Sequence, residues 1–83
     1  HPVYPNPFNP VAHIRFDITE EAHIEVAIYN INGELVDHLA DKSMQPGRIE
    51  MEWQARNLSS GIYFAILQVN GQSRAIRKMT LIK

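Results

Sequence analysis

The chain has 83 residues, a formal net charge of −1 and no cysteine. A chain of this length forms one domain or belongs to a larger protein, because domains typically run to about 100–150 residues. The lack of cysteine excludes disulfides, thiolate nucleophiles and cysteine-ligated metals. The balanced charge argues against a nucleic-acid-binding or anionic-membrane-binding module, which needs a clustered basic face.

The first ten residues contain four of the five prolines. Each proline removes a backbone donor and biases the preceding residue toward an extended conformation. We therefore expect residues 1–10 to form a lead-in or linker and residues 11–83 to form a single domain. Because the chain has no initiator methionine and no signal-peptide pattern, we expect it to be cut from a longer polypeptide, with Lys83 as a natural C-terminus.

Apolar and polar residues alternate with period two along most of the chain, which is typical of β-strands. The expected strands are residues 12–18, 23–30, 34–39, 48–53, 62–69 and 73–82. Asn32-Gly33 and Asn70-Gly71 predict hairpins in which both central positions adopt positive φ, and residues 41–47 are expected to form a loop. The fold class is all-β: an immunoglobulin-like or fibronectin-like sandwich of about seven short antiparallel strands. A small closed barrel is the alternative.

No catalytic, cofactor-binding or metal-binding residue is predicted. The four histidines lack the ligand spacing of a metal site. His13 and His23 are expected on adjacent strands and could form a surface zinc pair, but solvated histidines are the favoured interpretation. The carboxylates show no sign of facing each other across a cleft. The serines are not in a nucleophile elbow, and the glycines lack the spacing of a phosphate loop.

Two further features allow more than one interpretation. Trp53 with Tyr63 or Phe64 could form an exposed platform for sugars, but the alternation places Trp53 on the inward face as a core anchor. The last strand carries Arg74 and Arg77 together with Lys78 and Lys83. It could be a solvated edge strand, whose charges prevent aggregation, or an edge that pairs with a partner by strand addition.

Several motifs follow one another in a recognisable order. Tyr4-Pro5-Asn6-Pro7 opens the chain, Tyr29-Asn30-Ile31-Asn32-Gly33 forms a turn, and Trp53 is followed by Ser60-Gly61-Ile62-Tyr63 and a lysine-containing C-terminal strand. This order resembles the C-terminal sorting domains of the type IX (Por) secretion system, type A, over essentially the whole chain. It is also similar to the immunoglobulin-like domain of flagellar hook-capping proteins, but Gln54 and Ala55 replace the Asp-Gly that usually follows the tryptophan there.

The resemblance implies a non-catalytic domain of a larger exported protein. Its partners would be the cargo domains fused before it, the outer-membrane translocon and a cell-surface sortase, and its route would run through the periplasm to the cell surface or the medium. The resemblance places recognition in the final strand: Lys78, Met79, Thr80, Leu81, Ile82 and Lys83. The structural motif residues would be Tyr4, Pro5, Asn6, Pro7, Gly33, Trp53, Gly61 and Tyr63.

Two alternatives stay open beside this prediction. The domain could be a permanent immunoglobulin-like accessory or spacer module of a secreted enzyme, with or without glycan binding. In isolation, the strand over residues 73–82 could also pair with a copy of itself to form a homodimer.

Overall fold

The computed structural model describes residues 11–55 and 58–82, all as strands and short connections. The strands are β1 (Val11–Ile18), β2 (Ala22–Asn30), β3 (Leu35–Met44), β4 (Gly47–Gln54), β5 (Gly61–Val69) and β6 (Gln72–Leu81). The described part of the chain contains no helix that could cross a membrane. The Tyr4-Pro5-Asn6-Pro7 motif, the rest of the expected lead-in and Lys83 lie outside the described residues.

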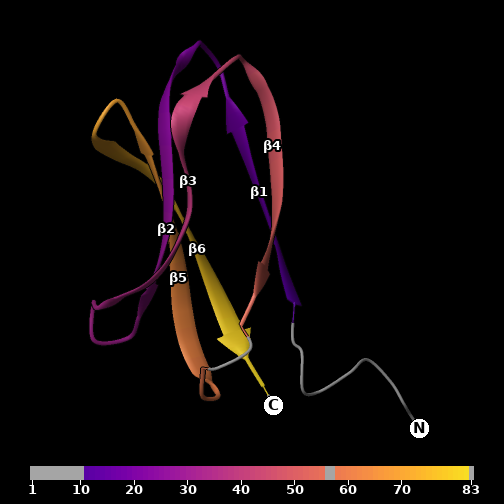
Figure 1. Cartoon of the computed structure of the whole chain (residues 1–83), viewed down its shortest axis with the longest axis vertical. Helices are drawn as coiled ribbons and strands as arrows, with labels where there is room; N and C mark the ends of the chain where they lie inside the picture. The colour runs from indigo at the N-terminus through magenta and orange to yellow at the C-terminus, as the bar shows by residue number, and fades with distance from the viewer. Residues whose placement is uncertain (1–10, 56–57, 83) are drawn as a thin grey trace, which may run out of the picture.

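The strands form two antiparallel sheets that face each other (Figure 1). One sheet has two strands, β1 and β4, and the other has four strands in the order β3-β2-β5-β6. The predicted all-β, immunoglobulin-like sandwich is therefore confirmed, and the closed-barrel alternative is wrong. About seven strands were expected, and the described residues contain six.

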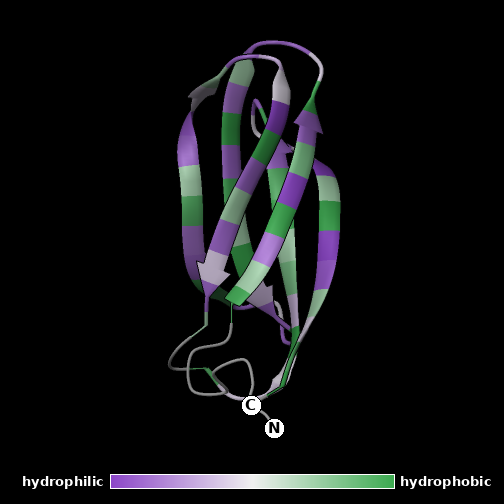
Figure 2. Cartoon of the chain, turned by 90° about the vertical axis from the view of Figure 1, so that its right-hand side faces the viewer, coloured by the Kyte–Doolittle hydropathy of each residue, from purple (hydrophilic) through white to green (hydrophobic). Residues whose placement is uncertain are grey.

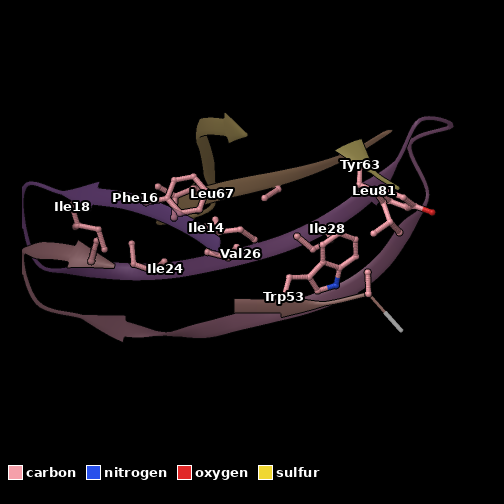
Figure 3. Packing of buried hydrophobic residues seen from close by; sticks show 13 residues of the cluster. Ile14, Phe16, Ile18, Ile24, Val26, Ile28, Trp53, Tyr63, Leu67 and Leu81 are labelled. Carbon is pink, nitrogen blue, oxygen red and sulfur yellow. The ribbon is translucent and has the colours of Figure 1, made fainter. Parts of the chain in front are cut away.

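The core lies between the two sheets (Figure 3). Alternate residues point inward because successive side chains of a strand project to opposite faces, and Figure 2 shows this alternation along both strands of the smaller sheet. Trp53 and Phe16 from the small sheet meet Ile24, Val26 and Ile28 from β2, and these are the largest fully buried side chains. None of the buried residues is charged or polar in the described part of the chain.

Two expectations about strand pairing are corrected. Residues 41–44 belong to β3 and not to a loop, because β3 continues its pairing with β2 as far as Met44, opposite Ala22. The polar side chains of Asp41, Lys42 and Ser43 are exposed and suit the solvent-facing edge of the sheet. His13 and His23 are not neighbours, because β1 pairs with β4 and β2 pairs with β3 and β5.

The two Asn-Gly turns differ from each other. Asn70 and Gly71 have φ angles of 51° and 84°, so this hairpin has positive φ at both positions, as predicted. At the other turn only Gly33 has positive φ, 82°. There the Gly33 N–H donates to the Asn30 carbonyl at 3.0 Å and the Asn30 N–H donates to the Glu34 carbonyl at 3.0 Å, which makes a three-residue loop ending in a left-handed glycine.

Candidate functional site

The two sheets leave two sides of the sandwich without backbone pairing, one between β1 and β6 and one between β3 and β4. Within the described ranges, β1 and β4 pair only with each other, β6 pairs only with β5, and β3 pairs only with β2. Three adjoining hollows follow the side between β1 and β6, from Val11 and Ile82 at one end to Thr19 and Arg74 at the other. They share Met79 and Arg77 of β6, and together they form a groove.

The C-terminal half of β6 forms one wall of this groove. Met79 is half-buried against the core and Leu81 is 8% exposed, so both point inward. Lys78 and Thr80 alternate with them and are exposed, while Ile82, just after the strand, is 76% exposed. Five of the six residues expected to be recognised, Lys78 to Ile82, thus lie on one accessible stretch of the edge.

The electrostatics of β6 are set by three cations and no carboxylate. Arg77 is directed across the groove, with its guanidinium 5.0 Å from the centre of the Phe16 ring on β1, a cation–π contact that ties the two edge strands together. Arg74 and Lys78 are exposed and have no ion pair among the described residues. This edge is therefore positively charged, and its backbone pairs with β5 alone among the described strands.

The other wall of the groove carries both ion pairs and carboxylates. Arg15 lies 3.6 Å from Glu50 and Asp17 lies 3.4 Å from Arg48, each pair reaching across to β4. Such exposed pairs contribute little to stability. Glu52 also lines the groove, 3.7 Å from His13, and Glu20 lines its far end with no ion pair among the described residues.

Two aromatic residues of the sequence motifs, Trp53 and Tyr63, stabilise the end of the groove near Leu81 from the core side. Trp53 is 2% exposed, so it lies on the inward face as the alternation predicts and cannot form an exposed platform for sugars. Its ring meets Tyr63 edge-on, with centroids 5.4 Å apart. The Tyr63 hydroxyl donates to the Ser59 carbonyl at 2.8 Å, which fixes the chain just before β5 much as a tyrosine corner does in immunoglobulin-like domains. Gly61 begins β5 and pairs with Leu81, so this corner supports the end of β6.

The sequence alone did not indicate the groove or the contact between Arg77 and Phe16. Both depend on which strands are neighbours, and a pattern of alternation does not specify pairing. The basic residues of the last strand were the one signal that pointed to this edge.

In a scan against protein-family models, the model of the secretion system C-terminal sorting domain matches residues 2–83, which is almost the whole chain. The chain belongs to this family. Among curated proteins, none matches the chain closely enough to count as a relative.

Membership gives the sorting domain its function. It is a C-terminal sorting signal for type IX secretion, carried as a tail by cargo proteins that are exported to the cell surface or beyond. Domains of this kind are normally non-catalytic.

Proposed function

We propose that the type IX machinery recognises this sorting domain along the C-terminal half of β6. The observation that supports the proposal is that β6 is an edge strand whose described backbone pairs with β5 alone. An edge strand presents a row of unpaired N–H and C=O groups to which another chain can add a strand. In this proposal the outer-membrane translocon supplies that strand and places it over the groove.

The side chains of residues 78–82 would have two different roles. Lys78, Thr80 and Ile82 are exposed and would contact the translocon directly, whereas Leu81 is buried and would hold the strand in place. Lys83, the last of the expected recognition residues, lies outside the described part of the chain. The charge of Lys78, which has no ion pair among the described residues, favours a strand with acidic or neutral side chains over a basic one.

The remaining steps of export are inferred from the role of the sorting-domain family. The cargo domains would be fused before the lead-in, the domain would be read in the periplasm, and a cell-surface sortase would remove it. The domain itself would perform no catalysis. The residues Tyr4, Pro5, Asn6 and Pro7 would have a structural role, and Gly33 and Gly61 would supply backbone freedom at turns.

Removing Lys78–Lys83 is the simplest test, and we expect it to block export of a fused cargo. That deletion also removes Leu81 and Met79 from the core, so it can fail by unfolding the domain. Substitutions at the exposed positions separate the two causes, because their side chains contribute little to packing. Loss of export with the domain still folded supports recognition at β6, and normal export contradicts it.

The same edge offers a second copy of the chain a place to pair. We propose that the isolated domain forms a homodimer through β6 at high concentration, because antiparallel pairing of two identical edges has two-fold symmetry. Light scattering tests this proposal. A monomeric mass at high protein concentration would contradict it and would leave recognition by the translocon unaffected.

A further inference from the structure

Four side chains of metal-binding type lie together on the outer face of the four-stranded sheet, on β2 and the edge strand β3. Glu25, His38 and Asp41 each place one ligand atom within 4.8 Å of the other two. His23 joins them, because its Nε2 lies 2.5 Å from Asp41 Oδ1. His38 Nε2 lies 3.0 Å from Glu25 Oε2. We propose that these four residues bind a divalent transition-metal ion, with Zn²⁺ as the best fit.

A β-bulge creates this arrangement. Asp41 pairs with Glu25 and His38 pairs with Ala27, so three steps along β3 match two steps along β2. In a regular strand, residues three apart project to opposite faces. The extra residue in β3 changes that parity and turns His38 to the same face as Asp41. Bulges commonly re-aim a side chain in this way next to functional sites.

The neighbours of the cluster leave it accessible. Ala27, opposite His38, has only a methyl group, so the imidazole can reach along the sheet to Glu25. Lys42 pairs with the fully buried Ile24 and so belongs to the core-facing side of the sheet, away from the two carboxylates. The four side chains are 39% to 54% exposed, which gives an ion entry and gives the ligands room to move.

The donor set selects the class of ion. Two imidazoles and two carboxylates match the nitrogen and oxygen ligands that Zn²⁺ accepts in four-coordinate sites, whereas Ca²⁺ and Mg²⁺ prefer oxygen alone. Two carboxylates also balance the charge of a divalent ion when both imidazoles are neutral. Ligand distances of about 2.0–2.2 Å bring tetrahedral ligand atoms to about 3.3 Å from one another. Glu25, His38 and Asp41 would therefore close in from within 4.8 Å, and His23 would rotate toward them from its contact with Asp41. The ion would replace the two histidine–carboxylate contacts and join β3 to β2 across the bulge.

The linear sequence gives no sign of this site. His38 and Asp41 are three residues apart, which is not a ligand spacing of a regular strand, and their partners lie on another strand. The site is also remote from the β6 edge, so its test does not depend on the proposed recognition of β6.

Isothermal titration of the 83-residue chain with ZnCl₂, combined with NMR of the imidazole signals, tests the proposal. We expect one ion per chain, with the signals of His23 and His38 shifted and that of His13 unchanged. His38→Ala and Asp41→Asn should each weaken binding by about tenfold or more. Zinc should also raise the Tm of the unaltered chain, since an ion that binds only the folded state stabilises it.

His13→Ala is the matched control. His13 is also an exposed histidine beside a carboxylate, 3.7 Å from Glu52, but it lies on the other sheet and belongs to no cluster of three possible ligands among the described residues. This variant should bind zinc as tightly as the unaltered chain. Circular dichroism without zinc should show all three variants folded, and if His38→Ala does not fold, the nearly isosteric Asp41→Asn decides. Absence of zinc binding, or an equal loss of affinity in His13→Ala, would overturn the proposal.

Discussion

The indole N–H of Trp53 donates a hydrogen bond of 2.9 Å to Asp37 Oδ2. Trp53 is on β4 and Asp37 is on β3, so this bond joins the two sheets on the side away from β6. On the other side, Arg77 of β6 meets the Phe16 ring of β1. Side-chain contacts thus link the sheets on both sides, while the backbone of β6 pairs with β5 alone among the described strands.

Asp37→Ala should destabilise the domain, because it leaves the partly buried indole N–H without its acceptor. Asp37 Oδ1 also accepts the His38 backbone N–H at 2.8 Å, and hydrogen bonds to charged groups contribute about 1.5–3 kcal/mol each. We expect a loss of about 1.5 kcal/mol or more in the free energy of unfolding. Urea unfolding followed by the fluorescence of the single tryptophan measures it.

Asp17→Ala is the control for this substitution. It removes another aspartate, one that lies in an exposed pair with Arg48 at 3.4 Å, and should cost about 0.5 kcal/mol or less. Equal losses in the two variants would mean that the Trp53–Asp37 bond does not stabilise the sandwich.

Tyr63→Phe should lower the free energy of unfolding by about 1 kcal/mol, since it removes the hydrogen bond to the Ser59 carbonyl but keeps the ring that packs on Trp53. Tyr29→Phe makes the same chemical change where no hydrogen bond of the hydroxyl is found among the described residues, and should change stability by less than about 0.5 kcal/mol. Thermal unfolding of both variants provides the comparison. If Tyr29→Phe costs as much as Tyr63→Phe, the corner bond has no special role.

Gly33→Ala should destabilise the Tyr29–Gly33 turn through backbone strain alone. Gly33 has a φ of 82°, and an added Cβ would meet no atom within 4 Å. The left-handed conformation costs other residues about 1–2 kcal/mol, so a loss of that size is expected in the free energy of unfolding. Gly33→Asn should cost less, because asparagine tolerates this conformation. Chemical denaturation of the two variants checks the order, and an alanine variant as stable as the asparagine one would contradict it.

The sequence predicted the fold through features that are local. Ile14, Phe16 and Trp53 alternate with polar residues, and this spacing alone placed them inside. Asn70-Gly71 likewise encodes its own turn geometry. The pairing of β1 with β4, by contrast, depends on contacts between residues far apart in sequence, which is why His13 and His23 were wrongly expected to be neighbours.

The functional surface was only partly predictable for the same reason. The charges of Arg74 and Lys78 marked the last strand, but the groove beside it depends on β1 and β6 lying next to each other across the two sheets. The histidine–carboxylate cluster depends on one extra residue in β3, since only that bulge turns His38 and Asp41 to one face. Residues 41–47 were expected to form a loop, which has no defined register with β2. The sequence therefore did not place Asp41 beside Glu25.

Secretion of a fused cargo by variants of β6 tests most directly whether the type IX machinery recognises the C-terminal half of this strand. A reporter protein with an N-terminal signal peptide, fused before this chain, would be expressed in a bacterium that has a type IX system. Lys78→Glu combined with Ile82→Ser changes two exposed residues at the C-terminal end of the edge. Arg74→Glu reverses a charge at the other end of the same strand and serves as the control.

We expect the double variant to accumulate in the periplasm, while Arg74→Glu and the unaltered chain reach the cell surface or the medium. Circular dichroism of the purified domains should show that all of them remain folded. Normal export of the folded double variant would contradict recognition at the C-terminal half of β6.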